Sequence, residues 1–196
     1  MPGNIGPSDA DRYGWPGPPE SALEADATRI ARHIARAHPP VVALLPLDDK
    51  QAVEGRLAPA LLRVAEALLN FTEESVAIID TWRTWPWGEA VQRGQAAAHR
   101  SRWLRPRILE IAPVPCGDAS AASVALENAL AARPPGLMTT LVNLGGYADR
   151  DAVPSALRLV SAVVLVVPPR RTRQRTLTSV VDHIQDGKLL GAILVG

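Results

Sequence analysis

Six short apolar segments recur along this chain, and their spacing constrains its fold more than any other feature of the sequence. Patterns typical of helices separate them. Strands that alternate with helices of this length are joined by right-handed crossovers and form a parallel sheet, which helices cover on both faces. We therefore predict an α/β fold, a three-layer sandwich with a mostly parallel sheet. The expected strands lie near residues 41–45, 75–79, 108–114, 138–143, 160–167 and 189–195, and the expected helices near 58–69, 88–103, 120–132, 151–158 and 173–185.

The composition fits one such domain with a tail before it. Residues 1–19 are rich in proline and glycine, and we expect them to be disordered. Residues 20–196 then form a single domain that begins with a helix from Glu20 to about Ala37. Hydrophobic residues make up 47% of the chain but aromatic residues only 4%, so the core must consist mainly of valine, leucine, isoleucine and alanine.

Charge and cysteine content exclude several classes of protein. The net charge of +1 gives no general attraction to nucleic acid, so we expect no nucleic-acid partner. The single cysteine, Cys116, excludes an internal disulfide and a cysteine-rich metal site. The longest apolar stretch, residues 160–167, is far shorter than the roughly 20 residues of a membrane-spanning helix, and the N-terminal segment lacks the apolar run of a signal peptide. We expect a cytoplasmic protein without a membrane span.

The segment between the first strand and its helix, residues 46–57 (PLDDKQAVEGRL), lies where a phosphate-binding loop would lie. Such a loop is rich in glycine, carries a lysine and ends in serine or threonine, whose hydroxyl helps to hold magnesium. Here Gly55 is the one glycine, Arg56 stands in place of the lysine, and Leu57 stands in place of the hydroxyl. Lys50 lies too far from the next strand to take the lysine's place, and we interpret it as a solvated loop residue. The sequence predicts a nucleotide-binding scaffold that has lost its nucleotide.

Pro59 locates the start of the helix that follows this loop. Proline is tolerated in the first turn of a helix but costs about 3 kcal/mol in its interior. We therefore expect the helix to begin near Leu57 or Ala58. Gly55 and Arg56 would then lie at its N-terminus, where a phosphate would bind.

Further segments match known motifs in the correct order. Residues 79–86 (IDTWRTWP) correspond to an "IDADLRRP"-like motif, and residues 142–146 (VNLGG) lie where a "DTPP" motif would follow its strand. Residues 165–172 (LVVPPRRT) fit "LVVRxGxT", and residues 190–195 (LGAILV) fit "LGVVLN" without its asparagine. These motifs resemble those of bacterial tyrosine kinases, the ATPases of capsule and exopolysaccharide assembly, which belong to the deviant-P-loop group. The resemblance covers roughly residues 20–196 and implies a P-loop NTPase-like fold.

The resemblance also implies which residues of the ancestral ATP site remain. Asp80 matches the first aspartate of the strand-end motif, whereas Trp82 replaces the second. Asn143 replaces the aspartate that is linked to magnesium. We therefore interpret Asp80 and Asn143 as vestigial catalytic residues and Gly55, Arg56 and Leu57 as a vestigial phosphate site, with no metal and no cofactor. Asp80 either positions a water molecule or caps the turn after its strand.

One motif of the family concerns assembly. Its members join into a ring through an E-x-x-R-x-x-R helix before the first strand. Asp26, Arg29 and Arg32 have this spacing, with aspartate in place of glutamate. Residues three apart lie on one face of a helix, so the three side chains form either a contact between subunits or an ordinary solvated face.

The aromatic residues suggest a second surface. Trp82, Trp85 and Trp87 are clustered in a chain that has few aromatic residues, and tryptophan is enriched at interface hot spots. We expect at least one of them to bind a partner, while others fill the vacated crevice. The family phosphorylates a C-terminal tyrosine cluster, but this chain contains only Tyr13 and Tyr147.

Three functional hypotheses follow. The first is a non-catalytic pseudokinase, a structural or regulatory partner in exopolysaccharide or capsule synthesis and export. It would bind a membrane-embedded polysaccharide co-polymerase or an active kinase subunit, which recruits it to the inner membrane, and it could form a homo-oligomer. The second is an active tyrosine kinase or ATPase that uses ATP and magnesium with an atypical loop. The third is a partitioning-type ATPase relative that binds DNA or a membrane surface through the arginines of residues 170–175.

Overall fold

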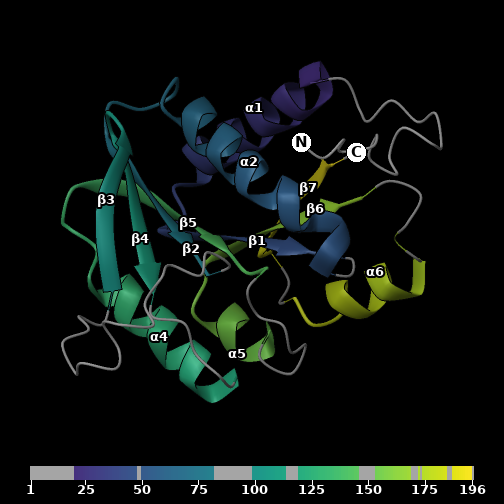
Figure 1. Ribbon diagram of the computed structural model, residues 1–196. Helices are drawn as coiled ribbons and strands as arrows, with labels where there is room; N and C mark the ends of the chain where they lie inside the picture. Colours follow the sequence, from purple (N-terminus) through teal and green to yellow (C-terminus); the bar gives the residue numbers. More distant parts are fainter. Residues whose placement is uncertain are drawn as a thin grey trace, which may run out of the picture.

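A computed structural model gives the fold of the chain (Figure 1). It describes residues 20–47, 50–81, 99–113, 119–145, 153–168, 172, 174–184 and 187–195. The predicted tail, residues 1–19, lies outside the described residues. Among the described residues, no helix has both the length and the apolar character that are needed to cross a membrane.

A seven-stranded sheet forms the centre of the domain, with the strand order β3-β4-β2-β5-β1-β6-β7. Every neighbouring pair is parallel except β3 and β4, which are antiparallel. The prediction of a mostly parallel α/β sheet is therefore confirmed. The strands are β1 (Val41–Pro46), β2 (Ser75–Asp80), β3 (His99–Arg105), β4 (Ile108–Pro113), β5 (Leu137–Asn143), β6 (Ala162–Val167) and β7 (Leu189–Leu194).

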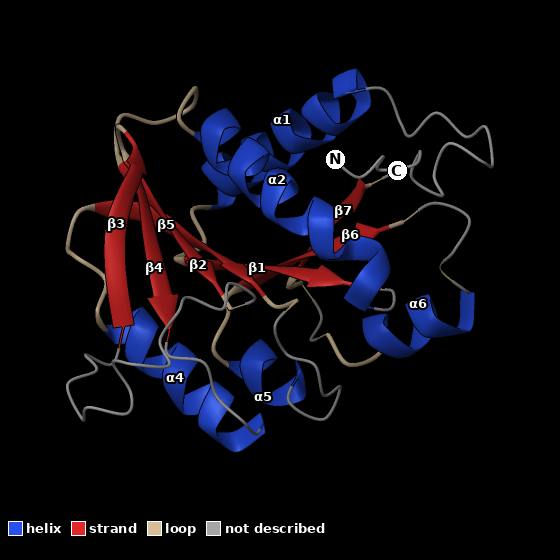
Figure 2. Ribbon diagram, viewed as in Figure 1, coloured by secondary structure: helices blue, strands red, loops and turns tan. Residues whose placement is uncertain are grey.

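Helices cover both faces of this sheet (Figures 1 and 2). Helices α1 and α2 lie on one face, and α4 and α5 lie on the other. Helix α6 contributes Val180 and Val181 to the hydrophobic cluster on the α4/α5 side. The helices are α1 (Glu20–Ala37), α2 (Lys50–Leu68), α4 (Ala119–Ala131), α5 (Val153–Arg158) and α6 (Gln174–Val181).

The core consists of two hydrophobic clusters, one on each side of the sheet. Strand β1 shows the division, since Val42 and Leu44 belong to the cluster under α1 and α2, whereas Val41, Ala43 and Leu45 belong to the other. Successive side chains of a strand point to opposite faces, and both faces here are covered. This is why the central strands are continuously apolar in the sequence.

The predicted helix over residues 88–103 is wrong where the structure describes it. Residues 99–105 form β3, which pairs with β4 along its length, and residues 88–98 lie outside the described residues. The two strands form a hairpin, and Arg107 at its turn has a positive φ of 67°. Arg102 lies directly opposite Glu110 and its Nε donates to Glu110 Oε2 at 2.5 Å. This pairing with β4 stabilises the strand over the helix.

The predicted start of α2 is also wrong. The helix begins at Lys50 rather than near Leu57 or Ala58, so Pro59 lies inside it and Gly55 precedes Pro59 by one helical turn. Proline cannot donate the helical hydrogen bond to the residue four positions earlier, which here is Gly55. The apolar face of α2 is deeply buried, and this burial offsets the cost of the proline.

Candidate functional site

The candidate site lies where β2 and β5 end. Strand β2 ends at Asp80 and β5 ends at Asn143, and the two residues are direct partners in the parallel register. Asn143 also lies opposite Leu44 of β1, the strand on the other side of β5. The carboxyl ends of neighbouring parallel strands meet at one edge of a sheet, which is the usual place for a ligand in an α/β fold. The structure therefore brings together the two residues that were predicted as vestigial catalytic groups.

Asp80 and Asn143 are hydrogen-bonded to each other. Asn143 Nδ2 donates to Asp80 Oδ1 at 2.7 Å. Both residues are buried, since Asn143 is 1% exposed and Asp80 is 4% exposed. A buried carboxylate needs a compensating donor or cation. With aspartate at position 143, two carboxylates would face each other and would require a proton or a metal ion between them. The asparagine amide supplies a donor in place of that cation.

Asn143 also fixes the loop that follows β5. Its Oδ1 accepts a hydrogen bond from the backbone N–H of Gly145 at 2.7 Å, and its backbone carbonyl accepts one from the hydroxyl of Thr81. Both ends of the side-chain amide are therefore in use. These bonds hold the ends of β2 and β5 together.

Leu57 packs beside this group. It is 3% exposed and belongs to the α1/α2 cluster of the core. A Cβ atom added to Gly145 would lie 2.8 Å from Leu57 Cδ2 and 2.9 Å from Asn143 Oδ1, so only glycine fits there. A leucine methyl group thus lies near the Asn143 amide, and Leu57 is the residue that was predicted to replace the magnesium-binding hydroxyl.

Gly55 and Arg56 lie beyond the first turn of α2, which contradicts their expected position at its N-terminus. Only the first four N–H groups of a helix lack an intrahelical partner, and these are the groups that can bind a phosphate. The N–H groups of Gly55 and Arg56 come later in α2 and are directed along the helix. Lys50, which we had interpreted as a solvated loop residue, is the first residue of the helix.

The described residues contain no group of three histidine, cysteine, aspartate or glutamate side chains that could hold a metal ion. Asp80 is the one carboxylate that the structure places at the strand ends together with a predicted site residue. Carboxylate oxygens are the ligands that Mg²⁺ prefers, usually together with substrate phosphates. The pair of Asp80 and Asn143 therefore offers one carboxylate, and its Oδ1 already accepts a hydrogen bond.

Two of the three predicted assembly residues bind within the chain. Arg29 Nη2 donates to Asp26 Oδ1 and to the backbone carbonyl of Ala192 in β7, both at 2.9 Å. Asp26 Oδ2 accepts from the N–H of Leu194 at 3.1 Å. The guanidinium of Arg32 lies 5.9 Å from the centre of the Phe71 ring. Asp26 and Arg29 attach α1 to the last strand, and their role between subunits stays a prediction.

The predicted tryptophan surface and both tyrosines lie outside the described residues, as do Arg170, Arg171 and Arg173. The tryptophans are Trp82, Trp85 and Trp87, and the tyrosines are Tyr13 and Tyr147. Their predicted roles remain predictions.

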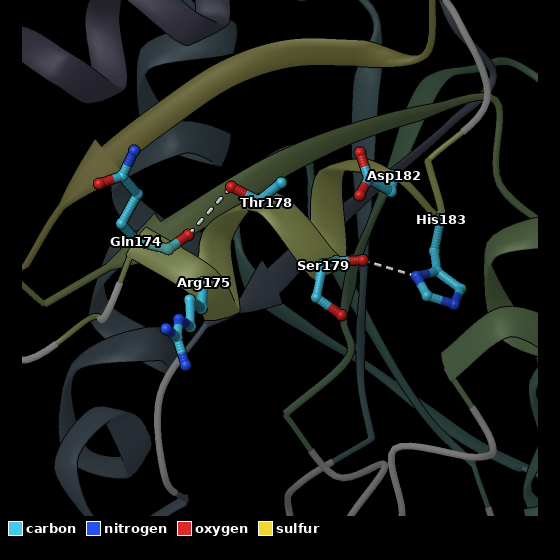
Figure 3. Close-up of a pocket in the computed structure, with 6 residues that line it drawn as sticks. All are labelled: Gln174, Arg175, Thr178, Ser179, Asp182 and His183. Atoms are coloured by element: carbon cyan, nitrogen blue, oxygen red, sulfur yellow. Dashed lines mark hydrogen bonds between the residues drawn. The ribbon is translucent and has the colours of Figure 1, made fainter.

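Arg175 lies on α6, beside a shallow cavity of about 440 Å³ (Figure 3). Several polar groups of this helix bond to its own backbone. The Thr178 hydroxyl donates to the carbonyl of Gln174 at 3.1 Å, and His183 Nδ1 lies 2.6 Å from the carbonyl of Ser179. The lining residues are Gln174, Arg175, Thr178, Ser179, Asp182 and His183. They come from one helix and its end, and they do not converge on a common point as a nucleotide site requires.

Solved structures with the same architecture are found among bacterial tyrosine kinase domains. The BceF tyrosine kinase domain matches with a TM-score of 0.61 at 13% identity, over 89% of this chain and 76% of that one. The kinase domain of VpsO matches with a TM-score of 0.56 at 17% identity, over 89% of this chain and 96% of that one. The chain has the fold of a bacterial tyrosine kinase domain. No protein-family model matches the sequence, and a search of the curated proteins also finds no match.

Sequence reasoning identified Asp80, Asn143 and Leu57 one at a time, each as the loss or retention of a motif residue. It missed the hydrogen bond between Asp80 and Asn143 and the contact of Leu57 with Gly145. Both depend on the order of the strands. The signal available in the sequence was that two strands end in a carboxylate and an amide, which can bond to each other when the strands are neighbours.

Proposed function

We propose that this chain is a non-catalytic relative of the bacterial tyrosine kinase domains and acts as a structural or regulatory partner in polysaccharide synthesis and export. The observation that carries the proposal is the hydrogen bond from Asn143 Nδ2 to Asp80 Oδ1. It gives the retained carboxylate a neutral donor. The fold supports the relationship, and the remodelled strand ends support the loss of catalysis.

The geometry opposes phosphoryl transfer in two ways. Transfer from ATP depends on positioned phosphates and on a metal ion that neutralises the developing charge. Leu57 has no atom that can bind a metal ion, and the amide of Asn143 brings no negative charge to attract one. The phosphates would also need free N–H groups, and those of the predicted phosphate site, Gly55 and Arg56, lie within α2, so that only the first turn of the helix, from Lys50, offers them.

The proposed partner is a membrane-embedded polysaccharide co-polymerase or an active kinase subunit. A chain without catalysis acts through its surfaces, and the clustered tryptophans after Asp80 are typical of a hot spot. Replacement of Trp85 and Trp87 by alanine is expected to abolish capture of such a partner and leave the melting temperature unchanged. Undiminished capture would exclude this surface.

The full chain allows a direct test by calorimetry with ATP and magnesium. We expect no heat of binding up to about 1 mM nucleotide, and no tyrosine phosphorylation when the chain is incubated with MgATP. Micromolar binding that is weakened by Asp80→Ala would contradict the proposal. It would instead favour an active kinase or ATPase, because Asp80 is retained at the end of β2.

A substitution at Asn143 tests the physical argument itself. Asn143→Asp places two buried carboxylates in direct contact, so we expect a lower melting temperature that added Mg²⁺ partly restores. The matched control is Asn143→Ala, which removes the amide without adding charge and should give no response to Mg²⁺. If the aspartate variant melts like the wild type without metal, the amide is not what satisfies Asp80.

A further inference from the structure

Strand β3 forms one edge of the sheet, and within the described part of the chain no strand pairs with its outer side (Figure 2). An edge strand presents N–H and C=O groups that can pair with another extended chain. Proteins commonly bind peptides in this way, by adding a strand to an open edge. The backbone of β3 therefore provides one half of a binding site.

The side chains of β3 carry strong positive charge. The strand and its turn, residues 99–107 (HRSRWLRPR), contain four arginines and no acidic residue. Arg102 pairs with Glu110 at 2.5 Å, and Arg105 pairs with Glu66 at 2.9 Å. Glu66 also pairs with Arg63 at 3.4 Å. A strand that docks beside β3 lies near the guanidinium groups of Arg102 and Arg105, whose side chains are 47% and 60% exposed.

The hairpin also offers an apolar contact. Trp103 is 59% exposed, and it lines a shallow cavity of about 540 Å³ at the end of the hairpin. The other lining residues are Ser75, Leu104, Arg105, Pro106 and Arg107. Trp103 lies opposite Leu109, which belongs to the α4/α5 cluster, whereas Arg102 lies opposite Glu110. Neighbouring residues of a strand point to opposite faces, so Trp103 and Arg102 lie on opposite faces of the hairpin.

These features select one kind of occupant. A second copy of the chain would place arginine beside arginine, and like charges directly opposite each other destabilise a strand pair. An extended peptide with acidic residues at alternate positions would place its carboxylates beside the arginines. The residues between them would reach the face of Trp103, where apolar or aromatic side chains fit.

We propose that the outer edge of β3 is a docking site for an extended acidic segment of a partner protein, in which acidic residues alternate with apolar ones. The segment adds to the sheet beside β3. Its backbone bonds to the open edge, its carboxylates pair with the arginines, and one apolar side chain packs on Trp103. This proposal does not depend on whether the chain binds ATP.

A synthetic peptide in which glutamate alternates with valine and tyrosine is the probe, and the full chain is the target. Fluorescence anisotropy of the labelled peptide measures binding, and hydrogen exchange measures protection of the β3 amides. We expect saturable binding that weakens as salt is raised, with protection confined to β3. Trp103→Ser should weaken binding by about tenfold or more, as removal of a hot-spot anchor does.

Three controls make the test decisive. Leu177→Ser removes an apolar side chain that is 37% exposed on α6, and it should leave binding unchanged. A peptide with lysine in place of glutamate should not bind, and a backbone N-methylated peptide should lose most of its affinity. Equal binding of either peptide, or no binding of the acidic peptide at about 1 mM, overturns the proposal. A concentration-dependent dimer that Trp103→Ser abolishes would also overturn it, in favour of a second copy.

Discussion

The two edges of the sheet differ. At one edge, side chains of α1 cover strand β7. At the other edge, no strand in the described part of the chain pairs with the outer side of β3. Asp26 accepts from the N–H of Leu194, and Arg29 donates to the carbonyl of Ala192. The N–H and carbonyl of residues two apart lie on the same side of a strand. The bonded pair of Asp26 and Arg29 therefore replaces a neighbouring strand over this part of β7.

The difference shows two ways of preventing the same hazard. Open edges invite pairing between copies of a protein, and natural sheets protect them by covering them or by charging them. Strand β7 is apolar, with Leu189 and Leu194 exposed, and it is covered. Strand β3 carries its own charges, which repel a second copy but not an acidic strand. The covered part of the β7 edge is closed to an extended chain, and the charged edge is selective.

The largest expected effect concerns the close fit of α1 on β7. Gly191 has a φ of +144°, and an added Cβ would lie 3.2 Å from Ile30 Cδ1. Gly191→Ala therefore combines backbone strain with a steric contact, and we expect a loss of about 3 kcal/mol in the free energy of unfolding. Urea denaturation measures it.

Gly187→Ala is the matched control for this substitution. Gly187 also has a positive φ, +83°, but nothing lies within 4 Å of an added Cβ. Only strain remains, so we expect a loss of about 1 kcal/mol. Equal losses for the two variants would mean that α1 does not press closely on β7.

The second effect concerns the charged edge. Glu110 is 3% exposed, and Arg102→Ala removes an ion-pair partner of its carboxylate. We expect a loss of about 2 kcal/mol, less than for a fully buried pair because Arg102 is half exposed. Arg105→Ala, whose partner Glu66 is more exposed, should cost less than about 0.5 kcal/mol. Adding Glu110→Gln to Arg102→Ala should restore part of the lost free energy of unfolding, because it removes the buried charge that has lost this partner. If it restores none, the charge of Glu110 is not the cause of the loss.

The third effect concerns the cover of β7. Asp26→Ala and Arg29→Ala each remove one bond to the strand edge and the bond between the two residues, so each should cost about 1 kcal/mol. The double variant should cost less than the sum, because the residues act together. Hydrogen exchange should show faster exchange of the Leu194 amide.

The same residues can test assembly. If α1 also joins subunits, Arg29→Glu changes the mass measured by sedimentation. An unchanged mass together with the faster exchange at Leu194 would leave α1 with the intramolecular role alone.

The central part of the fold follows from local sequence. Strands such as β1 and β6 are continuously apolar because both faces are covered, and this pattern was enough to predict them. Strand β3 could not be predicted in the same way, because it is polar and depends on pairs such as Arg102 with Glu110. The predicted start of α2 is wrong because proline is best tolerated in the first turn of a helix, whereas here the burial of the helix face offsets the cost of Pro59 in the interior.

The candidate site was predictable in its residues but not in its bonds. The motif positions indicated Asp80 and Asn143, and the structure places the two residues side by side. That the amide of one satisfies the carboxylate of the other depends on β2 and β5 lying side by side, which is a property of the strand order. The approach of Leu57 to Gly145 depends in turn on how α2 packs over those strand ends.

The position of Leu57 has a consequence for any molecule that might be designed to bind among the buried residues at the ends of β2 and β5. Such a molecule must first displace a side chain that is 3% exposed, and exposing a buried leucine costs about 2 kcal/mol. Only the open conformation would accept it, so its measured affinity would be lower than its intrinsic affinity by about thirtyfold. The Leu57 side chain therefore competes with any such molecule for the same space, and because it is part of the chain its effect does not depend on concentration.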